Sequence, residues 1–231
     1  MGRISVLDTG VLVGMVFAQD QHHDKCLQYV LNTNGPVYIT PCVGKEFQRL
    51  SSKVPKELKR EVQDHRKNLI RRFNKTKLDL TDLVNIQQNI LDTNDRAHRF
   101  LFEYYENKKK KKGSVKFREI KNDLSNIAME IGKDACQSHG GFESLIDPWT
   151  KGMKKYPAVE KNLLVHEGDD KDVCLEAHHI ATVETEDTEL ATANPKHFIR
   201  QIPGEPVSRK QNILFVTNIA HIEDTSLANY P

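Results

Sequence analysis

The chain of 231 residues lacks the features of a secreted or membrane-spanning protein. No stretch approaches the ~18 to 20 consecutive apolar residues that a transmembrane helix needs. The apolar run at 4–17 contains Asp8 and has neither a basic start nor a small-residue cleavage site, so it does not resemble a secretion signal. The four cysteines are widely spaced without a Cys-x-x-Cys pair, which favours reduced thiols over disulfides. We therefore expect a cytoplasmic protein that makes no contact with a membrane.

Two catalytic signatures are also missing. The sequence contains no Gly-x-Ser-x-Gly nucleophile motif and no glycine-rich phosphate loop. Hydrophobic residues make up 38% and charged residues 29% of the chain, which is enough apolar content for a folded core. At this length we expect either one domain with a large insertion or two small domains.

Charge is distributed very unevenly along the chain. Residues 1–44 carry 2 basic and 3 acidic side chains, residues 45–121 carry 22 and 11, and residues 122–231 carry 10 and 18. The basic middle predicts either a phosphate-binding surface beside acidic metal ligands, or complementary faces that pack and solvate one another. The lysine run at 108–112 is expected to form a loop. Candidate nucleic-acid contacts are Arg71, Arg72, Lys109, Lys110 and Arg118, although cations on amphipathic helices are often only solvated.

Both ends of the chain predict alternating strands and helices. Buried strands are expected at 4–7, 37–39, 190–192 and 212–217, and helices at 24–31, after Pro41 with Thr40 as N-cap, and at 172–184. This alternation predicts an α/β fold with a central parallel sheet covered on both faces.

The middle of the chain has a different period. Apolar residues recur at three- and four-residue spacing over 56–73, 80–91, 94–105 and 115–137, and none of these segments resembles a strand. We expect a core of 1–50 and 161–231 that is interrupted by a basic helical insertion at 51–160, and we find no internal repeat.

Three acidic residues fall where ligands bind to an open parallel sheet. Asp8 ends the first expected strand, Glu46 lies early in the helix after the second, and Asp172 opens the helix after the insertion, just behind Asp169 and Asp170. Converging carboxylates repel one another unless a cation neutralises them, and hard oxygen ligands suit Mg2+ or Mn2+. The alternative for each residue alone is a helix cap or a surface acid.

The blocks Ile4 to Gly10, Val37 to Phe47, Asp172 to Ala181 and Leu190 to Phe198 resemble the PIN-domain family in order and internal spacing. The resemblance covers residues 1 to about 50 and 165 to 217, and leaves the insertion unmatched. It implies a three-layer α/β/α fold and a metal-dependent nuclease, mostly acting on RNA and often the toxin of a toxin–antitoxin pair.

By this resemblance, Asp8, Glu46 and Asp172 are the acidic metal ligands. The fourth family position, usually Asp, is Asn194, which follows Thr192 and brings no negative charge. Asp169 or Asp170 could supply the missing carboxylate.

A zinc site is a competing interpretation. Its candidate ligands are Cys174, His178 and His179 on an expected helix, and His22, His23 and Cys26 near the N-terminus. Cys174 and His178 are four residues apart on one helical face, but the spacing matches no zinc finger.

The expected function is a Mg2+- or Mn2+-dependent endoribonuclease that leaves a 3′-hydroxyl. Asn194 also motivates an alternative, a PIN-like module that has lost catalysis and binds RNA, DNA or a protein. A DNA nuclease is a third option, because the same chemistry cuts either polymer. Further expected partners are an antitoxin and a second copy of the chain.

Overall fold

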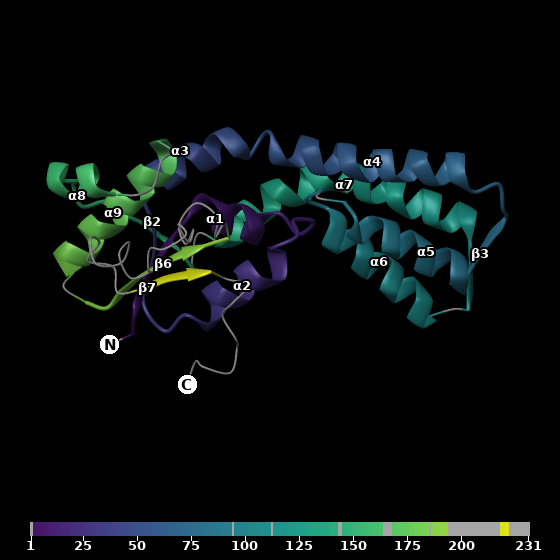
Figure 1. Ribbon diagram of the computed structural model, residues 1–231, viewed down its shortest axis with the longest axis horizontal. Coiled ribbons are helices and arrows are strands. Elements are labelled where there is room, and N and C mark those ends of the chain that lie inside the picture. The colour runs from purple at the N-terminus through teal and green to yellow at the C-terminus, as the bar shows by residue number, and fades with distance from the viewer. Residues whose placement is uncertain are drawn as a thin grey trace. The chain divides into compact units, whose positions relative to one another are not determined.

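A computed structural model of the protein describes residues 2–93, 95–111, 113–142, 145–163, 168–184, 186–193 and 218–221 (Figure 1). The chain divides into two compact units. The α/β unit comprises Met1–Met15, Asp24–Leu50 and Gly141–Pro231, and the helical unit comprises Val16–His23 and Ser51–Gly140. The expected insertion at 51–160 thus shares 51–140 with the helical unit, which also takes in the short segment 16–23.

The α/β unit is built on a five-stranded sheet in the order β5-β2-β1-β6-β7, and every pair of neighbours is parallel. The strands are β1 (Ile4–Leu7), β2 (Val37–Ile39), β5 (Asp147–Pro148), β6 (Thr188–Thr192) and β7 (Asn218–His221). The central strands β1 and β6 are buried at every position, as expected of a parallel sheet. The prediction of a mixed α/β unit with a parallel sheet is therefore confirmed.

Five helices belong to the described part of this unit: α1 (Thr9–Val16), α2 (His23–Asn32), α3 (Pro41–Leu50), α8 (Pro157–Asn162) and α9 (Gly168–Glu184). Thr40 caps α3 as predicted, because its Oγ1 accepts the backbone N–H of Val43 at 3.4 Å. Helix α9 begins four residues earlier than predicted. The strand expected at 212–217 lies outside the described residues.

A buried polar network ties β1, β6 and α2 together. Glu189 on β6 is 2% exposed and lies opposite Ser5 of β1 in the parallel register. Tyr29 of α2 donates its hydroxyl to Glu189 at 2.6 Å, and Arg3 donates to the other carboxylate oxygen at 2.9 Å. The buried charge is therefore paired and hydrogen-bonded, which makes its burial tolerable and fixes α2 against this face of the sheet.

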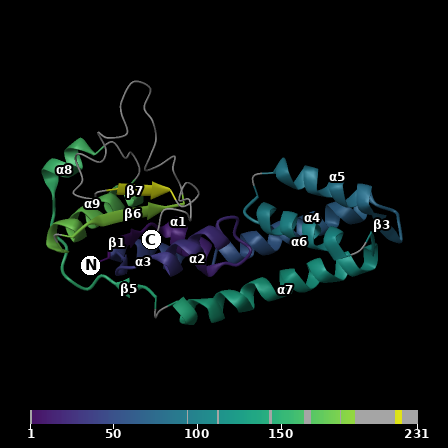
Figure 2. The same cartoon turned by 90° about the horizontal axis from the view of Figure 1, so that it is seen from below.

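Among its described residues, the helical unit contains four helices and a short antiparallel ribbon. The helices are α4 (Val54–Arg72), α5 (Leu80–Leu91), α6 (His98–Lys111) and α7 (Phe117–Phe142), and the strands are β3 (Lys77–Asp79) and β4 (Ser114–Lys116). The four helices and β3 are labelled in Figure 2. Arg66 on α4 donates to the Lys121 carbonyl of α7 at 3.0 Å, and Gln87 on α5 donates to the Phe102 carbonyl of α6 at 3.0 Å. Along the chain, the order helix, strand, helix occurs twice, first as α4-β3-α5 and then as α6-β4-α7.

The expectation that this unit contains no strand was wrong. Each strand has only three residues, with one buried apolar side chain, Leu78 or Val115, between polar ones. These two residues pair directly across the ribbon. A period of two that lasts three residues is too short to stand out against the flanking helical period.

The expected loop at the lysine run was also wrong, because Lys108 to Lys111 lie inside α6. Lysine has a high helix propensity, and Lys108 is neutralised by Glu119 at 2.8 Å and Asp123 at 2.7 Å on α7. Packing against an acidic neighbour thus extends the helix through a run of like charges.

The segment 16–23 belongs to the helical unit through specific polar contacts. The Asp20 side chain is 3% exposed, and Arg96 donates to it at 3.1 Å. Arg99 donates to the Gln21 carbonyl at 3.4 Å. A short piece of chain that is distant in sequence therefore completes this unit.

Within the described ranges, no helix combines the length and the hydropathy needed to cross a bilayer. Cys26, Cys42 and Cys174 are thiols rather than disulfides.

Candidate functional site

Asp8 occupies the carboxyl end of β1, where the chain turns directly into α1. Its backbone N–H donates to the Ala191 carbonyl at 2.9 Å, and its own carbonyl accepts the N–H groups of Val11 and Leu12 at 3.1 and 3.3 Å. The side chain is 5% exposed, and Thr192 at the end of β6 donates its hydroxyl to Asp8 Oδ2 at 3.0 Å. The residue is thus fixed between the two central strands.

The surroundings of Asp8 disfavour its negative charge. The pKa of Asp8 is raised to about 6, mainly by burial and in smaller part by the nearby charges of Asp170 and Glu46. The Thr192 hydroxyl and the Thr9 backbone N–H act in the opposite direction. Two carboxylates and two neutral donors therefore surround a buried acid, and a cation at this point would relieve the repulsion.

Glu46 reaches the same region from α3. Thr9, the residue after Asp8, donates its hydroxyl to Glu46 Oε2 at 2.6 Å. Helix α3 is held in turn by α9, because Glu176 Oε2 accepts the Cys42 backbone N–H at 3.0 Å in the first turn of α3. The side chain of Glu46 is half-buried and keeps access to solvent.

The third acid in this region is Asp170, whereas Asp172 points to solvent. Helix α9 buries Val173, Cys174 and Ala177, and Asp170 lies three and four residues before the first two, on the same face. Its charge acts on Asp8, while Asp172 on the other side of the helix is exposed. The structure therefore brings together Asp8, Glu46 and Asp170 of the expected acids.

A side chain at Gly10 would crowd Asp8. A Cβ atom at Gly10 would lie 3.2 Å from Asp8 Oδ2 and 3.3 Å from the Ala193 Cβ. The sequence Asp8, Thr9, Gly10 thus supplies a carboxylate, a hydroxyl that orients Glu46, and a close approach of α1 to the end of β6. Asn194 and the side chain of Asp169 lie outside the described residues.

No group of three or more His, Cys, Asp or Glu side chains in the described ranges is arranged to hold a metal ion. The chemistry of Asp8, Glu46 and Asp170 nevertheless fits a hard divalent cation, because all three offer carboxylate oxygens and Asp8 carries a buried charge beside two others.

The zinc interpretation finds less support. His179 Nε2 donates to the Gly152 carbonyl at 2.7 Å, and the Tyr156 hydroxyl donates to its Nδ1 at 2.8 Å, so both ring nitrogens are engaged. His178 is buried, with its ring centroid 4.5 Å from that of Tyr156. These histidines pack α9 against the segment that precedes α8.

The five candidate nucleic-acid contacts differ in their surroundings. Arg71, Arg72, Lys110 and Arg118 are exposed, and the guanidinium of Arg72 lies 5.5 Å from the Phe73 ring. Lys109 is instead paired with Glu106 at 2.7 Å and is 20% exposed. Lys109 is therefore a weaker candidate than the other four.

Sequence reasoning missed a pair of exposed lysines on the ribbon. Lys77 and Lys116 lie directly opposite each other in the β3–β4 register, and Arg118 follows two residues later. We call Lys77, Lys116 and Arg118 the ribbon cations. Like charges in directly opposed positions destabilise a sheet, so this pairing favours a bound anion. The only sequence signal is the polar–apolar–polar pattern of each strand.

Comparison with known proteins yields no match: no protein-family model, no curated protein and no solved structure matches the chain.

Proposed function

We propose that the protein is a metal-dependent nuclease that hydrolyses phosphodiester bonds in RNA at the carboxylate site of the α/β unit. The observation that carries the proposal is the buried carboxylate of Asp8 at the end of the central strand, with Glu46 and Asp170 close enough to raise its pKa. A structural ion pair would place a cation here, whereas this site gathers anions from three elements.

Asp8, Glu46 and Asp170 would hold Mg2+ or Mn2+. When bound, such an ion supplies charge neutralisation at the phosphate and lowers the pKa of a water molecule. The protein's own groups position the ligands: the Thr192 hydroxyl orients Asp8, the Thr9 hydroxyl orients Glu46, and Gly10 keeps α1 close to both.

The finer fold assignment, a PIN-like three-layer core, is part of the same proposal. It is supported by the parallel order of the strands and by acids that follow the carboxyl ends of β1 and β2. In that family Asp172 would be the third ligand, and we assign this role to Asp170 because of its face on α9.

The ribbon cations, with Arg71, are the proposed contacts to the nucleic-acid backbone. Each phosphate that is neutralised by lysine or arginine releases counterions, so binding through this surface should weaken steeply with salt. Phosphate contacts carry no sequence information, and they leave RNA and DNA equally possible as the polymer.

A second candidate function is a PIN-like module that binds RNA, DNA or a protein partner without cleaving it. It is favoured by Asn194, which brings no negative charge to the fourth position of the family pattern. An antitoxin partner and a homodimer are proposals that follow from the resemblance. A cytoplasmic location is a proposal that follows from the spacing of the cysteines and from an apolar run at 4–17 that does not resemble a secretion signal.

A cleavage assay on a mixed RNA pool and on single-stranded DNA, in Mn2+, Mg2+ or EDTA, tests the proposal. We expect metal-dependent cleavage that falls by on the order of 10³-fold in Asp8→Asn, because several kcal/mol of transition-state stabilisation are lost. Binding of Mn2+ followed by a shift in Tm gives a readout that is independent of turnover.

Salt-sensitive RNA binding in EDTA without cleavage in either metal would instead support the binding module. Equal cleavage by the wild type and by Asp8→Asn would refute the site.

A further inference from the structure

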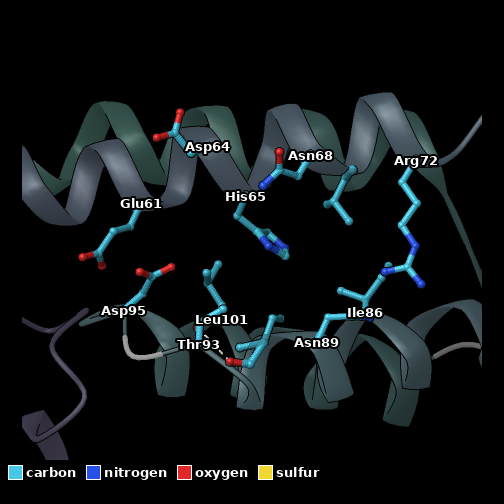
Figure 3. A pocket seen from close by; sticks show the side chains of 12 residues that line it. Glu61, Asp64, His65, Asn68, Arg72, Ile86, Asn89, Thr93, Asp95 and Leu101 are labelled. Carbon is cyan, nitrogen blue, oxygen red and sulfur yellow. Dashed lines mark hydrogen bonds between the residues drawn. The ribbon is translucent and has the colours of Figure 1, made fainter.

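The helical unit contains a pocket of about 290 Å³ between α4 and α5 (Figure 3). The α4 wall is a single helical face, since Glu61, His65, Asn68 and Arg72 are spaced by three or four residues. The opposite wall comes from Ile86, Asn89 and Ile90 of α5, the following turn, and Leu101 of α6. The volume lies at the lower end of the range for small-ligand pockets.

The two ends of the pocket carry opposite charge. Glu61 and Asp95 lie together at one end, and Arg72 lies at the other (Figure 3). Arg72 lies eleven positions after Glu61 on α4, which corresponds to roughly 16 Å along the helix axis. A ligand that satisfies both ends must therefore be elongated and dipolar.

The cation beside the acidic end is shared among several carboxylates. Arg96 donates to Asp20 at 3.1 Å and lies 3.6 Å from Glu57. Glu61 Oε2 accepts the Ala97 backbone N–H at 2.9 Å. Desolvation, and then the charge of Asp95, raise the pKa of Glu61 overall, although the backbone N–H groups of Ala97 and Arg96 and the charge of Arg96 lower it. A positively charged group placed between Glu61 and Asp95 would relieve this repulsion.

The middle of the pocket is neutral. Burial lowers the pKa of His65 to about 4, so its ring is uncharged near pH 7, and its Nε2 lies 3.0 Å from the Tyr105 hydroxyl oxygen. Asn68 and Asn89 extend from opposite walls (Figure 3). A carboxamide both donates and accepts hydrogen bonds, which matches the N–H and C=O of a peptide group.

We propose that this pocket binds a short extended peptide of about three residues with free termini. Its ammonium group would lie between Glu61 and Asp95, its carboxylate at Arg72, and its peptide groups beside Asn68 and Asn89. Three extended residues span about 10 Å, and one hydrogen bond of about 3 Å at each end brings the total to about 16 Å, the rise of α4 from Glu61 to Arg72.

The charge of the lining favours this ligand over a nucleotide. Three carboxylates, those of Glu61, Asp64 and Asp95, line the pocket with one guanidinium, that of Arg72. Asp64 is paired with Lys67 at 2.8 Å, which leaves one acid pair and one cation to bind a zwitterion. A phosphate group would meet net negative charge.

Isothermal titration calorimetry with the tripeptide Ala-Leu-Ala, in its free, N-acetylated and C-amidated forms, tests the proposal on the full chain. We expect saturable binding of the free peptide that weakens at least tenfold with either blocked form. Glu61→Gln, which keeps an acceptor for Ala97, and Arg72→Gln should each weaken the free peptide tenfold. Lys59→Gln, an exposed change on α4 outside the pocket, should leave binding unaltered.

Absence of saturable binding by the free peptide would overturn the proposal, as would equal affinity for the free and blocked forms. Binding of AMP or spermidine in place of the peptide would assign the pocket to another ligand class. The proposal does not rest on the nuclease assignment, because Ala-Leu-Ala binding is measured without RNA or metal.

Discussion

The two units place their charged side chains differently. In the α/β unit, Asp8 is buried beside two other carboxylates, and hydroxyl and backbone donors are its only stabilising contacts among the groups that set its pKa in the described structure. In the helical unit, cations such as Lys77 and Lys116 lie exposed on the ribbon and face each other. The acids near Asp8 are placed where a cation would relieve their repulsion, and the ribbon lysines are placed where an anion would relieve theirs. We propose a metal ion for the first and a nucleic-acid backbone for the second.

The strongest test of this contrast is a comparison of Asp170→Asn with Asp172→Asn. Only Asp170 lies on the face of α9 that acts on Asp8, so we expect about 100-fold weaker Mn2+ binding for Asp170→Asn and less than a twofold change for Asp172→Asn. Mn2+ titration followed by calorimetry provides the measurement. The reverse order of effects would restore the ligand set that the family resemblance implies.

Removing the buried charge should stabilise the metal-free protein. The folded state raises the pKa of Asp8 from 3.8 to about 6. Protonated Asp8 thus contributes stability that is fully present below about pH 4 and is lost as the pH rises through about 6. In EDTA at pH 8, Asp8→Asn should raise the free energy of unfolding by up to about 3 kcal/mol.

Urea denaturation at pH 8 and pH 4 measures this effect, with the exposed change Asp172→Asn as its control. The gain should vanish at pH 4. A less stable Asp8→Asn protein at pH 8 would show that the carboxylate is not strained.

Thr192→Val should have an intermediate effect. The substitution keeps the side-chain shape but removes the hydroxyl that donates to Asp8 Oδ2 at 3.0 Å. We expect roughly tenfold weaker Mn2+ binding, as for other groups that orient metal ligands. Thr182→Val, which removes a hydroxyl bonded to the His178 carbonyl on α9, is the matched control. Equal effects of the two changes would indicate a general loss of packing.

The smallest expected effect concerns the ribbon. Lys116→Glu converts a like-charge pair with Lys77 into an attractive one, so it should stabilise the fold by about 0.2 to 1 kcal/mol. The same change should weaken RNA binding. It should also reduce the slope of the logarithm of the binding constant against the logarithm of the salt concentration by an amount that corresponds to one to two phosphate contacts. Lys59→Glu on α4 serves as the control, and stabilisation with unchanged RNA binding would remove the ribbon from the proposed surface.

The sequence predicts the α/β unit well because its signals are local. The buried strand before Asp8 and the Thr40 cap of α3 follow from neighbouring residues, and the positions of Asp8 and Glu46 on their elements follow from them. The choice between Asp170 and Asp172 as the third acid depends on which face of α9 is buried. Extending the apolar positions Val173, Cys174 and Ala177 backwards by one turn would have indicated Asp170.

Other features depend on contacts that are distant in sequence. The lysine run becomes helical because Lys108 meets Glu119 and Asp123 on α7. The ribbon forms because Leu78 and Val115, 37 residues apart, share a buried pair. Neither contact leaves a periodic pattern along the chain, so neither could be predicted from local spacing.

The Asp20–Arg96 contact has a consequence for the modularity of the protein. The segment 16–23 belongs to the helical unit although it precedes most of the α/β unit in sequence, so the chain passes between the two units four times. A deletion of 51–140 would remove Arg96 and leave the buried Asp20 carboxylate without its cation, next to the buried Phe17. The helical unit therefore cannot be removed by deleting 51–140 alone. Any shortened form of the protein must also replace the segment 16–23.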